Sequence, residues 1–100
     1  MKKNSKVRIS EIIRYDLTTS NAILYNEKNE EIYIFNDSAT VMFKIIIDCF
    51  NMSSNEIRID DLINLFCLKY TSKGASTKQI ETDAIELIDK MFDLKILLSE

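Results

Sequence analysis

The stretch that decides the fold is Glu31-Ile32-Tyr33-Ile34-Phe35-Asn36-Asp37-Ser38-Ala39-Thr40-Val41-Met42-Phe43, because the hydrophobic pattern changes its period within it. Up to Phe35 the residues are mostly β-branched or aromatic, which is typical of a short strand. The next three residues suit the start of a helix, and we expect Asp37 or Ser38 to be its N-cap. The sequence therefore predicts a strand that leads directly into a helix.

The predicted helix from Ala39 to Phe50 is apolar on most sides. Only Thr40, Lys44 and Asp48 interrupt it, and their i, i+4 spacing predicts one narrow polar stripe. A helix of this kind belongs in the centre of a fold, because packing must offset the modest helix propensity of its isoleucines.

Two more strands are predicted upstream. Between residues 7 and 17 apolar side chains recur at every second position, but Glu11 and Ile12 break the pattern, so we expect a bulge or a break there. The short run Ala22–Tyr25 is a further strand. Polar residues 26–30 predict a hairpin that joins this run to the strand that begins at Glu31.

Two more helices are predicted downstream, from about Ile59 to Tyr70 and from Ser76 to about Leu94. Ser76 has capping-box spacing to Gln79 at the start of the second of these. The residues expected to point inward from the first are Leu62, Ile63, Leu65, Phe66 and Tyr70. The apolar tail Ile96-Leu97-Leu98 is expected to form a short strand or a plug on the core.

Together these elements predict an α+β fold, in which a three-stranded antiparallel sheet is followed by three helices in a winged-helix-like order. The chain has 100 residues, 46% of them hydrophobic, which suits a single domain over residues 1–100. Residues 1–6 are expected to be flexible.

The composition argues against catalysis and against metal or cofactor sites. The chain has no His, which removes the usual general base and the commonest metal ligand. Its single glycine, Gly74, cannot form a phosphate-binding loop. Its paired carboxylates are sequence neighbours, which do not face each other on a helix or a strand. We therefore expect no enzyme activity, no metal and no cofactor.

The two cysteines, Cys49 and Cys67, have no CxxC spacing. We expect two buried free thiols in a reducing compartment, with a disulfide between two helices as the alternative. The basic N-terminal residues precede no long apolar run, and no stretch approaches the ~20 apolar residues that span a bilayer. The protein is therefore expected to be cytoplasmic, without a membrane partner.

The third predicted helix carries acids outward and a wide apolar arc inward. Its outward acids and the net charge of −3 would repel phosphates, so a nucleic-acid partner is not expected. The apolar arc spans about 180°, wider than the ≳100° stripe that a surface helix commonly shows. Either the tail or the sheet covers the excess, or part of the arc lines an open groove. We predict the groove beside Ile85, Ile88 and Phe92, with Ala84 leaving room and Glu81 at the rim. The arc leaves the other side of the helix open as well.

The strand that precedes the central helix offers a second feature for binding. A small antiparallel sheet has two edges that carry unpaired N–H and C=O groups. If the outer edge of this strand is free, an extended peptide can add to it and pack its apolar side chains against the third helix. The strand residues of this predicted peptide-binding site are Glu31, Ile32, Tyr33, Ile34 and Phe35.

Residues 32–46 resemble the PqqD-like family, whose pattern is an aromatic-rich strand, then Leu-Asn-x-Thr/Ser-Gly/Ala, then an apolar helix with Ile-Trp. The matching positions are Phe35, Asn36, Ser38, Ala39 and Met42-Phe43. The departures are Phe35 for Leu, Phe43 for Trp and Lys95 for a frequent Gly. Further segments that look like the family's later helices are Ile59-Asp60-Asp61-Leu62, Tyr70 and Asp83 to Leu98, so the resemblance covers about residues 20–98.

The resemblance implies a non-catalytic recognition element in pathways that modify ribosomally made peptides. Members of the family bind the leader segment of a precursor peptide as an extra strand. They present the precursor to a modifying enzyme, often a radical S-adenosylmethionine (radical SAM) enzyme, or to a leader peptidase or cyclase, as in lasso peptide or sactipeptide-type maturation. A precursor peptide and such an enzyme are therefore the expected partners of a monomer or weak dimer. Two alternatives stay open, a small homodimerising interaction module and a winged-helix DNA-binding regulator.

Overall fold

The computed structural model describes residues 6–18, 21–52, 57–71 and 77–99. Its elements in chain order are β1 (Lys6–Ile9), β2 (Ile13–Leu17), β3 (Ala22–Asn26), β4 (Glu31–Ile34), α1 (Asp37–Met52), β5 (Ile57–Arg58), α2 (Ile59–Thr71), α3 (Thr77–Asp93) and β6 (Leu97–Ser99). The strands form two three-stranded antiparallel sheets, in the orders β5-β1-β6 and β2-β3-β4. The predicted α+β class, with a three-stranded sheet and three helices, is confirmed.

The first predicted strand is divided between the two sheets. The break falls where Glu11 and Ile12 interrupt the sequence pattern, and there the Ile13 N–H donates to the Ser10 carbonyl at 3.2 Å. Before the break, β1 pairs with β5 and with β6, so the apolar tail is a strand. After the break, β2 pairs with β3. The predicted flexible segment is wrong at Lys6, which opens β1, while residues 1–5 lie outside the described ranges.

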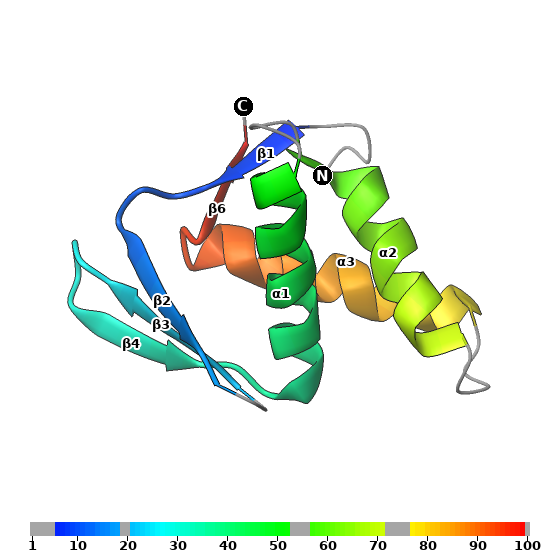
Figure 1. Ribbon diagram of the computed structural model, residues 1–100, viewed down its shortest axis with the longest axis horizontal. Coiled ribbons are helices and arrows are strands. Elements are labelled where there is room, and N and C mark those ends of the chain that lie inside the picture. The colour runs from blue at the N-terminus through cyan, green and yellow to red at the C-terminus, as the bar shows by residue number, and fades with distance from the viewer. Residues whose placement is uncertain (1–5, 19–20, 53–56, 72–76, 100) are drawn as a thin grey trace.

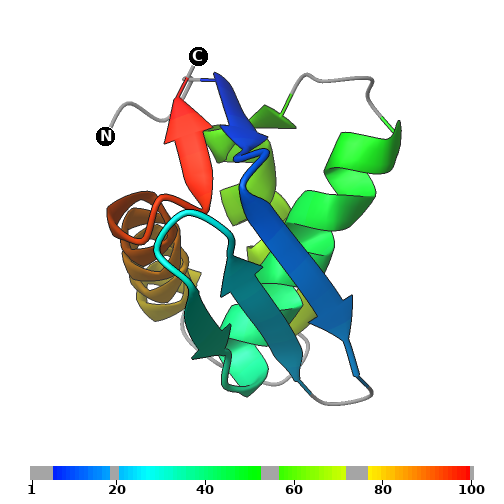
Figure 2. The same cartoon turned by 90° about the vertical axis from the view of Figure 1, so that its left-hand side faces the viewer.

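Helix α1 lies against the β2-β3-β4 sheet. Figure 1 shows α1 along one face of this sheet, with α2 on its far side and α3 crossing behind it. Figure 2 shows that β4 is the strand of the sheet nearest α3. Phe43 of α1 is fully buried, and its ring contacts those of Tyr15 and Phe35 edge-to-face at centroid distances of 5.3 and 5.9 Å. Burying such a ring contributes roughly 1.5–3 kcal/mol, so the aromatic contacts hold α1 and the sheet together.

The turn from β4 into α1 is capped by Asn36. Its side-chain oxygen accepts a hydrogen bond from the Ala39 N–H at 3.0 Å, and its carbonyl accepts from the Thr40 N–H at 2.8 Å. These are the two bonds that define an N-cap, so the predicted caps, Asp37 and Ser38, are wrong by one and two positions. Both of those residues lie inside the first turn of α1.

Thr40 does not belong to the predicted polar stripe, because it is buried. Its hydroxyl accepts a hydrogen bond from the Ala22 N–H at 3.0 Å and donates to the Phe35 carbonyl at 3.3 Å. Of the other stripe residues, Asp48 is exposed and Lys44 is half-buried. Thr40 therefore satisfies two backbone groups at the corner where the sheet meets α1.

Helix α2 buries most of the residues predicted to face inward, namely Leu62, Ile63 and Phe66. Tyr70 is half-buried and lies against Phe66 at a ring distance of 4.8 Å. Leu65 is also predicted to face inward, but it is 39% exposed. The predicted capping box at Ser76 and the loop around Gly74 lie outside the described residues. No helix in the described ranges is long and apolar enough to cross a membrane.

The two cysteines are free and half-buried, so the alternative of a disulfide between helices is wrong. Burial raises the pKa of both thiols above the ordinary value. The nearby carboxylates of Asp61 and Asp48 raise the pKa of Cys49 further, and that of Glu81 raises the pKa of Cys67. Both groups therefore stay protonated and unreactive at neutral pH.

Helix α3 ends in a Schellman motif that places a lysine in a conformation suited to glycine. The Ile96 N–H donates to the Met91 carbonyl at 2.9 Å, and the Lys95 N–H donates to the Phe92 carbonyl at 3.0 Å. Lys95 has a φ of 62°, in the left-handed region. This is the position where the family pattern often has Gly, and only Gly takes this conformation without a Cβ penalty.

We expect Thr40→Val to destabilise the protein, because the Ala22 N–H loses its acceptor inside the core. The expected cost is about 1–3 kcal/mol of unfolding free energy, measured by urea denaturation. Thr40→Ser is the control that keeps the hydroxyl, and hydrogen exchange of the Ala22 amide separates the two. That amide should exchange faster in the Val variant than in the Ser variant. Equal exchange rates would contradict the role given to the hydroxyl.

We expect Lys95→Gly to raise the Tm, because it removes the left-handed strain at the end of α3. The gain should be about 1 kcal/mol, which corresponds to roughly 4–8 °C in a domain of this size. Asp89→Gly is the matched control, because Asp89 is exposed in the same helix and has no left-handed backbone to relieve. That variant should lower the stability by about 1 kcal/mol. If thermal melting showed a lower Tm for both variants than for the parent, the interpretation would be refuted.

Candidate functional site

Strand β4 is an edge strand, as the sequence predicts, and no described strand pairs with its outer side. Two hydrogen bonds fix the alternation across the sheet. The Phe35 N–H donates to the Ala22 carbonyl, and the Glu27 N–H donates to the Ile12 carbonyl, both at 2.9 Å. The backbone N–H and C=O groups of the even-numbered residues of β3 therefore point toward β4, and those of the odd-numbered residues point toward β2.

This alternation shows which backbone groups of β4 are free for a partner. Ile32 and Ile34 lie opposite Tyr25 and Ile23, which are odd-numbered residues of β3. The N–H and C=O groups of Ile32 and Ile34 therefore point away from β3, toward the open edge. Tyr33 lies between them, and its backbone groups point toward β3.

The side chains of β4 divide between the two faces of the sheet. On the inner face Phe35, just after the strand, is buried, and Tyr33 is half-buried with its hydroxyl donating to the Glu31 carboxylate at 3.1 Å. On the outer face Ile32 and Ile34 are 65% and 71% exposed. Four of the predicted strand residues, Glu31–Ile34, therefore form the open edge, while Phe35 is buried just after it.

Two hollows lie along α3, and the smaller of them reaches the edge strand at Ile34. The smaller one, of about 140 Å³, is lined by Ile34, Phe35, Asn36, Ala39, Leu87, Lys90 and Met91. The larger one, of about 380 Å³, is lined by Ser38, Phe66, Tyr70, Gln79, Ile80, Asp83, Glu86, Leu87 and Lys90. Leu87 and Lys90 line both, so the hollows are neighbours along one side of α3.

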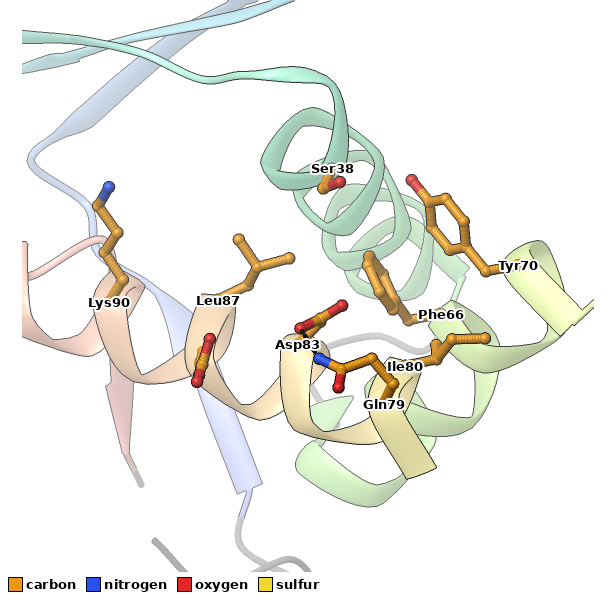
Figure 3. Close-up of a pocket in the computed structure, with 9 residues that line it drawn as sticks. Ser38, Phe66, Tyr70, Gln79, Ile80, Asp83, Leu87 and Lys90 are labelled. Atoms are coloured by element: carbon orange, nitrogen blue, oxygen red, sulfur yellow. Dashed lines mark hydrogen bonds between the residues drawn. The ribbon is translucent and has the colours of Figure 1, made fainter. Parts of the chain in front are cut away.

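The larger hollow has apolar walls and a charged rim (Figure 3). Leu87 points toward the space beneath the first turn of α1, and Phe66 and Tyr70 of α2 lie beyond it. Asp83 accepts a hydrogen bond from the Gln79 side chain at 2.9 Å. Asp83 and Lys90 are both exposed, so the charges lie at the mouth of the hollow and the apolar surface lies below.

The volumes of the hollows indicate what they can accept. Small-molecule sites usually enclose about 300–1,000 Å³, so the smaller hollow is below that range and the larger one is at its lower end. Shallow apolar hollows beside an open strand edge suit the side chains of an extended peptide. Among the described residues, no cluster of three or more His, Cys, Asp or Glu side chains could hold a metal ion.

The predicted groove residues of α3 are on the wrong side of the helix for these hollows. Ala84 and Ile88 are fully buried in the core, and Ile85 and Phe92 are half-buried against it. Glu81 lies beside α2, close enough to Cys67 to raise the pKa of that thiol. None of these five residues lines either hollow.

The side of α3 that does line the hollows carries Asp83, Leu87 and Lys90 at i, i+4 and i+7. Leu87 lies near one end of the apolar arc, the end opposite Ile85, so the arc contained the right residue without indicating its role. The contributions of Phe66, Tyr70 and Ser38 were missed, because the hollow exists only where α2, α3 and the first turn of α1 meet.

Comparisons with known proteins identify the fold. A scan against protein-family models and a search of curated proteins found no match. Among solved structures, the chain is similar to TbiB1 in complex with the TbiA(beta) leader peptide, with a TM-score of 0.72, 10% identity and coverage of 90% of this chain and 93% of that one. It is also similar to a lasso peptide synthetase B1 complexed with the leader peptide, with a TM-score of 0.67, 18% identity and coverage of 92% and 96%. At these identities the likeness establishes a shared fold over nearly the whole chain.

Proposed function

We propose that this protein binds the leader segment of a ribosomally synthesised precursor peptide as a strand added to β4. The observation that carries the proposal is the open edge of β4, whose residue Ile34 lines the smaller hollow, with the larger hollow next to it along α3. The two similar structures are both complexes with leader peptides, which supports the same role for this fold here. The resemblance of residues 32–46 to the PqqD-like family points the same way.

The geometry divides the work of binding between backbone and side chains. Ile32 and Ile34 offer their N–H and C=O groups, which would fix the register of the peptide. The peptide residue between them, opposite Tyr33, would point inward to the smaller hollow. Two β4 residues alone make a short ladder, so side chains in the hollows would supply much of the affinity.

The same proposal includes an enzyme partner, because the site itself holds no catalytic constellation among the described residues. The partner would be a modifying enzyme such as a radical SAM protein, or a leader peptidase or cyclase. The similarity to lasso peptide synthetase B1 favours the lasso pathway over sactipeptide maturation. We place this role in the cytoplasm, in keeping with the two free thiols.

A DNA-binding role finds less support than peptide binding. The acids Asp83, Glu86, Asp89 and Asp93 are all exposed on α3, which would be the recognition helix of a winged-helix regulator. A face with this charge repels the phosphate backbone. A second copy of the chain pairing at β4 is the remaining competitor, and the concentration dependence of amide protection separates it from a peptide.

Peptide binding should protect the amides of β4 in an alternating manner. The probe is a synthetic peptide covering the leader segment of a candidate precursor peptide chosen from the genes that neighbour this one. We expect hydrogen exchange of the Ile32 and Ile34 amides to slow on binding, because they gain acceptors. The Tyr33 amide already bonds within the sheet and should change little. Protection that appears without peptide and rises with protein concentration would instead indicate self-association.

Leu87→Glu should weaken binding of the same peptide by about thirtyfold, the loss typical of a binding hot spot. Ile85→Glu is the matched control, because Ile85 is also half-buried on α3 but lies away from the hollows. It should bind within about twofold of the parent in a calorimetric titration. The reverse pattern would return the groove to the side of Ile85, Ile88 and Phe92.

A further inference from the structure

The outer face of the β2-β3-β4 sheet carries an apolar patch, of which only Ile34 also lines a hollow. The patch consists of Ile23, Tyr25, Ile32 and Ile34, and we call it the outer patch. Ile32 and Ile34 are 65% and 71% exposed, and Tyr25 is 38% exposed. Two adjacent cross-strand pairs build it, because Ile23 lies opposite Ile34 and Tyr25 lies opposite Ile32.

Charged residues bound the outer patch on the side of β2. The same two rows continue into β2 as Arg14, opposite Tyr25, and Asp16, opposite Ile23. Both residues are exposed, and Arg14 pairs with Glu27. Toward β4 no such rim exists among the described residues, and the most exposed isoleucines are those at the open edge.

The position of the patch indicates what would cover it. A strand added to β4 lies in the plane of the sheet, so its residues opposite Ile32 and Ile34 project from the outer face. Their Cβ atoms would lie about 4.5–5.5 Å from those of the two isoleucines, within the distance at which cross-strand pairs stabilise a sheet. The patch is thus continuous with the proposed peptide site.

We infer that the peptide carries β-branched or aromatic apolar side chains at the two alternate positions opposite Ile32 and Ile34. The inference rests on the proposed function and adds a specificity rule to it. Together with the inward residue opposite Tyr33, these positions make three consecutive apolar residues. The recognised segment is therefore apolar on both faces, like a strand of a buried sheet, and is not amphipathic. An amphipathic segment with its apolar face turned inward would leave both isoleucines beside polar side chains.

A library selection tests this rule and does not require the natural ligand. The probe is a phage-displayed library of random 12-residue peptides, selected on the immobilised protein. We expect the enriched sequences to share Val, Ile, Tyr or Phe at two positions separated by one apolar residue. Replacing either outer position with Asp in an enriched peptide should weaken its binding by about two- to fivefold.

Variants of the protein show whether the isoleucines cause the preference. Ile32→Thr/Ile34→Thr keeps β propensity but removes apolar surface, and should abolish the preference at the outer positions. Tyr25→Thr is the matched control, because Tyr25 belongs to the outer patch but is one strand away from the edge. That variant should select the same sequences as the parent. Circular dichroism is the check that all three proteins are folded.

The outcomes separate this inference from the proposed function. Enriched peptides with random residues at the outer positions would overturn the inference and leave leader binding intact. A selection that enriches no peptide would count against both. Light scattering could show that the parent is a dimer and that both Tyr25→Thr and the isoleucine variant are monomers. A second copy of the chain would then be the occupant of the patch, and the inference would be overturned.

Discussion

The buried hydroxyl of Thr40 is the contact on which the geometry of this protein depends. It binds the backbone of Ala22 in β3 and of Phe35 after β4, and it is carried by the first turns of α1. The Asn21 side chain donates to the same Phe35 carbonyl at 2.7 Å, so the corner has a second polar contact. Only Phe35 and Asn36 lie between β4 and α1, which leaves the strand little freedom relative to the helix.

The fixed position of this corner matters because several elements together form the site. Its edge comes from β4, and its hollows come from α1, α2 and α3. A displacement of α1 would change the spacing between the edge and Leu87. Binding an extended peptide costs conformational entropy, because the peptide chain becomes ordered. A binding site whose elements are already fixed before binding adds little to this entropy cost. The polar corner and the aromatic contacts of Phe43 thus serve binding as well as stability.

Local patterns were sufficient to predict the helices, the β3–β4 hairpin and the break near residue 11, because each depends on neighbouring residues. Features that depend on distant parts of the chain were not predicted. A threonine on an apolar helix looks the same in sequence whether it faces water or a backbone group, so Thr40 was misplaced. The side of α3 that faces β4 depends on where α2 lies. The apolar arc contains Ile85 and Leu87 alike, and only the packing of α2 decides between them. The second sheet joins the two ends of the chain, which no local pattern reveals.

The pairing of β1 with β6 has a practical meaning for how this domain can be joined to others. The first and last described strands lie side by side, with Val7 opposite Ser99. Figure 1 shows this pair near the C-terminal end of α1, away from the corner where β4 leads into the helix. A fluorescent label or a fused protein attached before β1 or after β6 would emerge from the same part of the fold. Neighbouring ends also suit insertion of the whole domain into a surface loop of a host protein, or circular permutation through a short linker.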